Sequence, residues 1–413
     1  MSEYIETVIV GGGQAGLSIS YYLTQKACQH IVLEQSPQAS NAWRNQRWDS
    51  FTLVTPNWQI RLPGAEYQGD EPDGFMTRDE IVTYLERYVE RFNLPVHYGI
   101  QVTAVEQNSP KAGYIVKTTS GMFSATNVVV ATGLFQRPKI PSFSIAFPAE
   151  IKQLHSSEYR NPEALPVGAV LVVGSGQSGC QIAEELYQSG IKVYLCVSSA
   201  GRIPRRYRGK DITWWIDKIG SYERTVDKLP SPKAKFKGNP HLSGKGGGHS
   251  LNLHQFARDG VVLLGRIQGV HDGKITLAAD LKENLAKADK FEVDLLKEIN
   301  DYIEKNGLDI PKENLLNLRD GYDMEEILEL DLKSIGVTSV IWAMGYKFDF
   351  SLVHLSVLDS DGYPIHKRGL TNYPGLYLLG LPWLHTVKSG LLLGVGEDAA
   401  FIASKIVAQQ QKK

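Results

Sequence analysis

The chain contains the same strand–turn–helix–strand pattern twice, and this repeat constrains the fold more than any other feature of the sequence. Each copy has an apolar run, a glycine-rich turn, a stretch with helical character and a second apolar run. A glycine turn placed between a buried strand and a helix is the context in which a GxGxxG pattern predicts a dinucleotide-binding unit. The four parts lie at residues 4–10, 11–16, 17–25 and 30–34 in the first copy, and at 169–173, 174–179, 180–188 and 192–197 in the second.

The glycines of each turn have distinct physical roles. The first permits the tight turn, the second removes a Cβ from between the backbone and a pyrophosphate, and the third lets the helix pack closely on the strand. The helix N-terminus then presents unpaired N–H groups to phosphate oxygens. The predicted cofactor-binding turns are Gly11-Gly12-Gly13-Gln14-Ala15-Gly16 and Gly174-Ser175-Gly176-Gln177-Ser178-Gly179.

The residues at the end of each second apolar run distinguish the two ligands. Glu34, followed by Gln35, ends the run of the first copy, where a carboxylate accepts hydrogen bonds from ribose hydroxyls and disfavours a 2′-phosphate. Ser198 takes the equivalent place in the second copy. Arg202 and Arg205 follow it and suit a 2′-phosphate, because guanidinium groups bind phosphate oxygens bidentately. The sequence therefore predicts FAD in the first unit and NADPH in the second, with a solvated basic loop as the alternative reading of the arginines.

Composition narrows the class of protein further. The chain has 413 residues, of which 42% are hydrophobic, and this predicts a packed protein of two or three domains. Because 44 Lys and Arg residues balance 45 Asp and Glu residues, there is no overall field to attract nucleic acid or an anionic membrane. No apolar run approaches the roughly 20 residues of a membrane-spanning helix, and no export signal precedes the first run. We expect a cytoplasmic protein.

Cysteine and histidine spacing argues against a metal site or a dithiol centre. The three cysteines lie far apart without a CxxC pair, which is typical of a protein from a reducing compartment. Three histidines are close in sequence but have neither helical i, i+4 spacing nor a neighbouring cysteine, so we expect no metal. These residues are Cys28, Cys180 and Cys196, and His241, His249 and His254.

Further segments give the chain a family resemblance. They lie at residues 43–58, 128–141, 155–159, 341–346 and 374–398. Together with the doubled glycine turn, these segments resemble the single-component (class B) flavin monooxygenases, a branch of the two-dinucleotide-binding-domain flavoproteins. The resemblance implies an α/β fold with two Rossmann-like domains, the NADPH domain being inserted into the FAD domain. The FAD domain is expected at 1–160 and 337–413, and the NADPH domain at 161–336 with a helical insertion near 279–305.

The resemblance also implies a reaction and a set of site residues. In this family NADPH reduces FAD, and O2 then forms a C4a-(hydro)peroxyflavin that oxygenates a small organic substrate at a heteroatom or carbonyl group. His155 is implied as a linker residue that couples domain motion to NADPH contact. The residues implied near the reacting atoms are Asn57, Trp383 and His385. Those implied to contact a cofactor, besides the two turns, are Trp43, Trp48, Thr55, Thr132, Gly133, Gly380 and Lys388.

Departures from the family pattern leave alternatives open. Ala149 and Ile151 replace the Phe and Gly of the family signature before His155, and Met344 replaces a threonine of the hinge. The reaction could therefore be Baeyer-Villiger or heteroatom oxygenation. An NADPH-flavin reductase or oxidase, a halogenase-like enzyme and a non-catalytic flavin-binding regulatory protein are the other candidates. The predicted helix at 279–305 covers a domain, lies on a membrane surface or packs against a second subunit in a homodimer.

Overall fold

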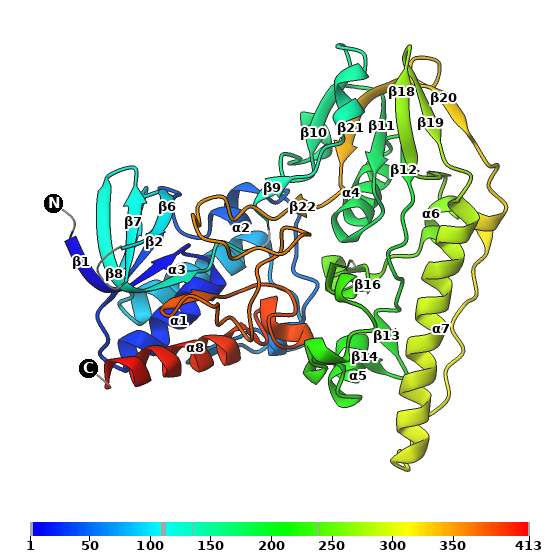
Figure 1. Ribbon diagram of the computed structural model, residues 1–413. Coiled ribbons are helices and arrows are strands. Elements are labelled where there is room, and N and C mark those ends of the chain that lie inside the picture. The colour runs from blue at the N-terminus through cyan, green and yellow to red at the C-terminus, as the bar shows by residue number, and fades with distance from the viewer. Residues whose placement is uncertain (1–2, 109–112, 134, 237, 239, 412–413) are drawn as a thin grey trace.

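The structure is built on two separate parallel β-sheets, each flanked by helices (Figure 1). The computed structural model describes residues 3–108, 113–133, 135–236, 238 and 240–411, so Leu134 of the segment 128–141 lies outside the described residues. Both ends of the chain lie beside the first sheet, and the long helix α7 (Leu281–Lys305) lies on the far side of the second. The expected α/β fold with two Rossmann-like units is confirmed.

The first sheet contains the first glycine unit, and its central strands are parallel. Its strands are β1 (Glu3–Val10), β2 (His30–Glu34), β5 (Val96–Tyr98), β6 (Val102–Gln107), β7 (Tyr114–Thr118), β8 (Gly121–Val130) and β23 (Leu376–Leu378). The order is β5-β2-β1-β8, all parallel; β23 lies beside the carboxyl half of β8, and the antiparallel pair β6-β7 lies beside its amino half. Helix α1 (Gln14–Gln25) connects β1 to β2, and α8 (Val395–Gln410) packs against α1. A strand from near the C-terminus therefore completes the sheet that the N-terminus begins.

The second sheet contains the second glycine unit. Its strands are β10 (Lys152–His155), β11 (Ala169–Val173), β12 (Val193–Cys196), β17 (Val262–Leu264) and β21 (Val337–Trp342), in the order β10-β21-β11-β12-β17 and all parallel. Helix α4 (Gln177–Gln188) connects β11 to β12. Because β10 and β21 pair within this sheet, the expected domain boundaries after residues 160 and 336 are each wrong by one strand. The sequence alone could not show which sheet each flanking strand joins.

Two chain segments cross between the sheets, and they pair with each other. β9 (Arg137–Pro138) on the outgoing segment forms an antiparallel pair with β22 (Tyr346–Lys347) on the returning segment. Arg137 forms an ion pair with Asp349 beside this pair. The two crossings therefore form one double-stranded connection, so neither can move without the other.

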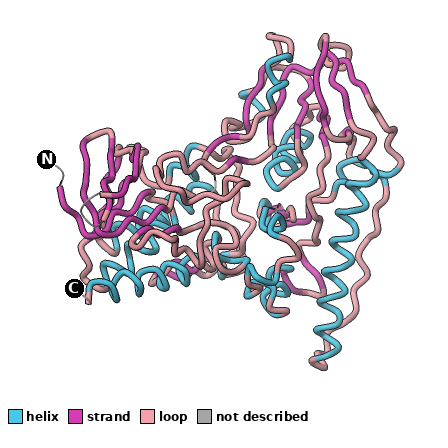
Figure 2. The backbone as a smooth tube through the Cα atoms, in the orientation of Figure 1, coloured by secondary structure: helices cyan, strands magenta, loops and turns pink. Residues whose placement is uncertain are grey.

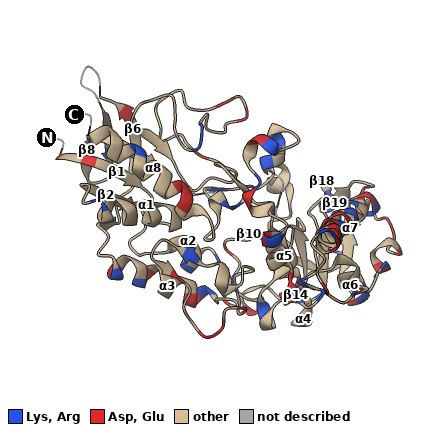
Figure 3. Ribbon diagram, turned by 90° about the horizontal axis from the view of Figure 1, so that it is seen from below, with Lys and Arg blue, Asp and Glu red and all other residues tan. Residues whose placement is uncertain are grey.

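Helix α7 is the principal addition to the second unit. Figure 2 shows it as the longest helix, and a three-stranded antiparallel sheet of β18 (Ile267–His271), β19 (Lys274–Leu277) and β20 (Glu329–Asp331) lies at one end of it. Figure 3 shows acidic and basic residues mixed along α7, in agreement with the ion pairs Glu283–Lys287, Lys290–Asp294 and Lys297–Asp301. Its buried residues Leu281 and Leu285 join the core of the second unit. The helix therefore packs on the second unit, which was one of the three interpretations of this segment.

Further helices and strands lie between these elements along the chain. They are α2 (Asn41–Asn45), β3 (Arg61–Leu62), β4 (Ala65–Glu66), α3 (Arg78–Arg91), β13 (Arg206–Tyr207), β14 (Lys210–Asp211), α5 (Ile212–Lys218), β15 (Leu242–Ser243), β16 (His249–Ser250) and α6 (Leu253–Arg258). In the ranges that the structure describes, no helix has the length and apolar character needed to cross a membrane.

The second sheet's core gives a stability prediction. Leu171, at the centre of β11, is completely buried, whereas Val167 just before the strand is fully exposed. Leu171→Ala should lower the free energy of unfolding by about 2–5 kcal/mol, because it removes buried methyl groups and leaves a cavity. Val167→Ala is the matched control and should change it by less than about 0.5 kcal/mol. Urea unfolding checks both; equal effects of the two substitutions would contradict this account of the core.

Candidate functional site

The first glycine turn is shaped by close backbone approach. Gly11 has a φ of +108°, and a Cβ there would lie 2.6 Å from the carbonyl oxygen of Ala131 at the end of β8. A Cβ at Gly16 would overlap the carbonyl oxygen of Gly11. By contrast, a Cβ at Gly13 would point into open space, with no protein atom within 4 Å. Two of the glycines are therefore needed for the fold, and the third keeps a space free.

The second turn has the same geometry. Gly174 has a φ of +107°, and a Cβ there would lie 2.6 Å from the carbonyl oxygen of Ala343, which follows β21. A Cβ at Gly179 would overlap the carbonyl oxygen of Gly174, whereas one at Gly176 would again meet nothing within 4 Å. The repeat in sequence is thus a repeat of the same cradle in three dimensions.

Both cradles fit the pyrophosphate of a dinucleotide. α1 and α4 start directly after Gly13 and Gly176, and no side chain caps either helix N-terminus. Neither first turn contains an acidic residue, so the unpaired N–H groups and the helix dipole can act on an anion. The open side of each turn is the side from which a pyrophosphate approaches.

The carboxyl ends of β2 and β12 differ in chemistry, as the sequence predicts. The Glu34 carboxylate accepts hydrogen bonds from the backbone N–H groups of Gly12 at 2.8 Å and Ser36 at 2.9 Å. It is half-buried and held beside the first turn, where it can accept hydrogen bonds from ribose hydroxyls. In the second cradle, the hydroxyl of Ser175 accepts from the N–H of Ser198 at 2.8 Å, so no carboxylate occupies this position.

The arginines after Ser198 are not free to bind phosphate, which contradicts the sequence-based expectation. Arg202 donates from Nε to Glu292 at 2.9 Å and is only 7% exposed. Arg205 is 2% exposed and binds both carboxylate oxygens of Asp211 at 2.7 and 2.8 Å. Glu292 lies 90 residues from Arg202 along the chain, and nothing in the sequence pairs the two.

Segments from the C-terminal part of the chain lie against the first cradle. The amide of Gln14 donates to the carbonyl oxygen of Gly390 at 2.8 Å. A Cβ at Gly380 would lie 2.6 Å from the Cβ of Ala15, so only glycine permits this approach of β23 to α1. Gly133 follows β8 on the open side of the turn, and Thr132 accepts a hydrogen bond from Gln136 at 2.7 Å. The structure thus brings three of the expected cofactor-contacting segments together.

Three expected site residues have other partners. Trp48 is 4% exposed and belongs to the hydrophobic core of the second unit, so it packs between the units and is not open to a cofactor. The Asn57 amide donates to the carbonyl oxygen of Glu71 at 3.0 Å and accepts from the N–H of Met76 at 3.1 Å, which occupies both of its ends. Lys388 forms ion pairs with Glu223 and Glu397. Each of the three side chains therefore has protein partners in this structure, and its role at a cofactor stays a prediction.

Near these residues, Trp43 and Thr55 remain compatible with a role at the site. Trp43 is half-buried and its ring lies 5.2 Å from the guanidinium carbon of Arg47. Arg47 was missed by sequence reasoning; it is 9% exposed and also lies over the rings of Phe51 and Phe135. The only sequence signal for it was an arginine among aromatic residues. Thr55 is half-buried.

Trp383 and His385 lie on the segment that follows Gly380, and both remain partly exposed. Trp383 has a φ of +55°, a left-handed conformation that is uncommon for a bulky residue. The N–H of His385 donates to the Ser389 hydroxyl at 3.0 Å, which fixes the turn at this point. The imidazole and the indole therefore stay on a backbone that is held in one conformation.

His155 lies where the crossing segments meet the second sheet. Its ring is completely buried, and burial lowers its pKa. Nε2 donates to the carbonyl oxygen of Gly345 at 3.1 Å, and Nδ1 accepts from the N–H of Ser157 at 3.2 Å. A neutral imidazole satisfies both contacts. His155 therefore connects the outgoing segment to the returning one, which agrees with a positioning role at the hinge.

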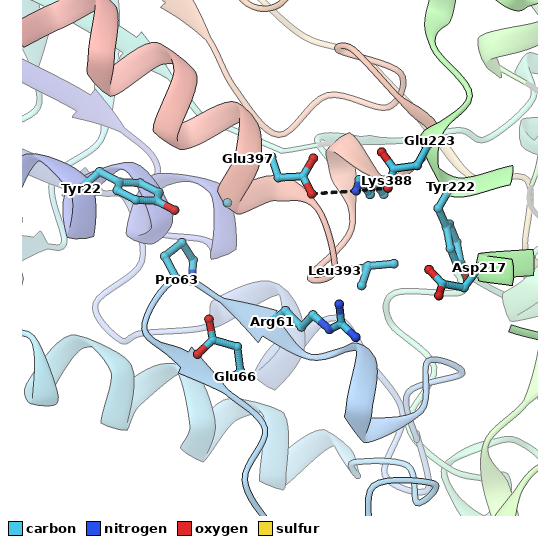
Figure 4. A pocket seen from close by; sticks show the side chains of 11 residues that line it. Tyr22, Arg61, Pro63, Glu66, Asp217, Tyr222, Glu223, Lys388, Leu393 and Glu397 are labelled. Carbon is cyan, nitrogen blue, oxygen red and sulfur yellow. Dashed lines mark hydrogen bonds and ion pairs between the residues drawn. The ribbon is translucent and has the colours of Figure 1, made fainter. Parts of the chain in front are cut away.

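The two units also contact each other beyond the crossings. Residues 224–226 and 385–387 run side by side: the Val226 N–H donates to the carbonyl oxygen of His385 at 2.9 Å, and Thr225 and Thr386 form a bridge. A cavity of about 420 Å³ opens beside this contact, lined from the first unit by Arg61 and from the second by Tyr222 (Figure 4). Figure 4 also shows Lys388 joined to Glu397 at the edge of the cavity. No residue of either glycine turn lines it.

Two of the three histidines that are close in sequence, His249 and His254, have separate partners. His249 Nε2 lies 2.7 Å from Glu184, and His254 accepts from the N–H of Gly321 at 3.0 Å. Within the described ranges, no three His, Cys, Asp or Glu side chains are grouped so that they could share a metal ion.

The two open glycines give a paired prediction. Gly13→Ala should abolish FAD binding and Gly176→Ala should abolish nicotinamide nucleotide binding, because each methyl group fills the space into which a pyrophosphate fits. Neither change should lower the melting temperature of the apoprotein, since no protein atom is displaced. Gly238→Ala, at an exposed glycine with no atom within 4 Å, is the control and should leave both ligands bound. Flavin absorbance and calorimetry with NADP⁺ measure the outcome; a flavin-loaded Gly13→Ala protein would refute the assignment of the first cradle.

Solved structures of known proteins are similar to this structure. The structure of a flavin-containing monooxygenase from Stenotrophomonas maltophilia superimposes with a TM-score of 0.67 at 20% identity, covering 99% of both chains. That of OTEMO, in complex with FAD and NADP, gives a TM-score of 0.60 at 16% identity and covers all of this chain and 87% of the other. These two similarities show the fold.

Sequence comparison identifies the family. A probable indole-3-pyruvate monooxygenase, YUCCA4 of Arabidopsis thaliana, is 27% identical over 98% of this chain and 90% of its own. An uncharacterized oxidoreductase, CzcO-like, of Geobacillus kaustophilus is 34% identical over 98% of this chain and 99% of its own. Residues 8–219 match the family described as pyridine nucleotide-disulphide oxidoreductase. The chain belongs to the pyridine nucleotide-disulphide oxidoreductase family.

Proposed function

We propose that the protein is an NADPH-dependent flavin monooxygenase that transfers one atom of O2 to a small organic substrate with a heteroatom or carbonyl group. The observation that carries the proposal is the pair of open glycine cradles on two sheets that are joined by one double-stranded connection. Similar proteins named as monooxygenases, one of them in complex with FAD and NADP, support it. FAD is assigned to the cradle of β1 and α1, and NADPH to that of β11 and α4.

The cysteines argue against the disulfide chemistry that the family description includes. A disulfide reductase needs a reactive thiolate near its flavin. Cys28, Cys180 and Cys196 are all buried and unpaired, and they belong to three different hydrophobic clusters. Burial raises the pKa of each thiol, that of Cys196 to about 12, so none is a thiolate at neutral pH. Three reduced thiols also fit the cytoplasm, where we place the enzyme.

The chain's own residues bind and orient the two nucleotides. Bound FAD supplies the redox chemistry, taking a hydride from NADPH and passing electrons to O2. Glu34 holds the adenosine of the flavin nucleotide, and the N-terminus of α1 binds its pyrophosphate. Gln14 fixes Gly390, and with it the segment that bears Trp383 and His385, against the same cradle. This segment is therefore our candidate for the wall of the oxygenation site.

The connection between the units controls how the nucleotides meet. Hydride transfer requires the nicotinamide to come within about 3–3.5 Å of the flavin, so the second unit must present its ligand to the first in a defined orientation. The β9–β22 pair and the buried contacts of His155 give the crossing segments a fixed geometry. Rotation about this connection, together with release of the contact between residues 224–226 and 385–387, allows the change of orientation that catalysis needs.

Isotope labelling tests the proposed reaction. The FAD-loaded protein should oxidise NADPH under ¹⁸O2 and convert a thioether or a cyclic ketone into a product that carries one ¹⁸O atom. Release of hydrogen peroxide in step with NADPH oxidation, without labelled product from either probe, would contradict monooxygenation and favour a reductase or oxidase. A flavin that stays oxidised on addition of NADPH would favour a non-catalytic binding protein. The Gly176→Ala variant is the control and should show no NADPH oxidation.

A further inference from the structure

Helix α7 lies directly beside the ribose end of the second cradle. The side-chain amide of Asn284 is 3.4 Å from the carbonyl oxygen of Val197, at the end of β12. About two turns further along the helix, the ring of Phe291 lies so close to Gly201 that a Cβ on Gly201 would be 2.9 Å from the ring. α7 thus packs along the loop at 197–202, which carries the residues that face the adenosine of a nucleotide in this cradle.

Carboxylates of α7 bind the arginine of this loop. Glu292 accepts from Nε of Arg202 at 2.9 Å and from its Nη2 at 3.1 Å, which is a bidentate pair. Asp289 lies 3.2 Å from Nη2, and the side chain of Asn252 accepts from Nη1 at 3.1 Å. Asp289 is itself fixed by the hydroxyl of Tyr322 at 2.7 Å. All three guanidinium nitrogens of Arg202 therefore have protein partners.

The neighbouring arginines are also engaged. Arg205 is bound by Asp211, donates to the carbonyl oxygen of Val54 at 2.8 Å and lies over the ring of Phe75. Arg206 donates to the carbonyl oxygens of two glycines, 247 and 248. A bidentate carboxylate uses the same donors that a phosphate would use, so a 2′-phosphate gains Arg202 or Arg205 only by displacing a carboxylate.

We propose that Glu292 and Asp289 of α7 set the nucleotide preference of the second cradle by holding Arg202 away from the 2′ position of the adenosine. The enzyme then accepts NADH nearly as well as NADPH. This inference rests on the proposed function of the second cradle, and it concerns only the choice between two nucleotides that share every group except the 2′-phosphate.

Binding of the oxidised nucleotides to the FAD-loaded protein tests the inference without turnover. Titration calorimetry of the unaltered protein should give dissociation constants for NADP⁺ and NAD⁺ that differ by less than about tenfold. Glu292→Gln should tighten NADP⁺ binding by about tenfold and leave NAD⁺ binding unchanged, because a neutral amide replaces the bidentate carboxylate that competes with a phosphate for Arg202. Arg202→Gln in the Glu292→Gln background should return NADP⁺ binding to its original strength.

A matched control separates the local effect from a general change of charge. Asp301→Asn removes one negative charge from the exposed side of α7, where Asp301 pairs with Lys297, and should alter neither constant. A preference for NADP⁺ of more than about a hundredfold in the unaltered protein would overturn the inference, and this measurement needs no variant. Weaker NADP⁺ binding after Arg202→Gln alone would also overturn the inference, and so would unchanged NADP⁺ binding after Glu292→Gln. Failure to bind either nucleotide would instead overturn the assignment of the second cradle.

Discussion

The structure depends on one constraint, the close contact of backbone with backbone at the start of α1 and of α4. In each cradle the first and third glycines let the helix approach the strand and its neighbour so closely that any side chain would collide with a carbonyl oxygen. This approach leaves the helix N-terminus uncapped and open at the carboxyl end of a parallel sheet. A site for a negatively charged ligand therefore results from main-chain geometry, and we propose that side chains such as Glu34 select the nucleotide.

The two cradles act together because of how the chain passes between them. The paired segments β9 and β22 make a single connection, and the buried ring of His155 joins both segments at the edge of the second sheet. A second contact, between residues 224–226 and 385–387, brings the second unit against the segment that also reaches the first cradle through Gln14. These contacts thus join the second unit to the part of the first unit that surrounds its cradle.

Sequence patterns predicted the features of the fold that depend on residues close together in the chain. The doubled turn, its flanking strands and the contrast between Glu34 and Ser198 are local features, and the structure agrees with them. The tertiary contacts of several predicted site residues were not visible in the sequence. Trp48 packs into the core of the other unit, Asn57 binds the loop at 71–76, and Arg202 is bound by α7, a helix whose position no pattern in the sequence reveals. Likewise, only pairing in three dimensions assigns β10 and β21 to the second sheet.

The stoichiometry of bound cofactors tests the central claim, that one chain holds two dinucleotides at once in separate cradles. Equilibrium dialysis of the protein against saturating FAD and then against NADP⁺ measures it directly. The account predicts one FAD per chain and one NADP⁺ per chain, with no flavin released as the second ligand binds. Displacement of FAD by NADP⁺, or a total of one dinucleotide per chain at saturation, would contradict it.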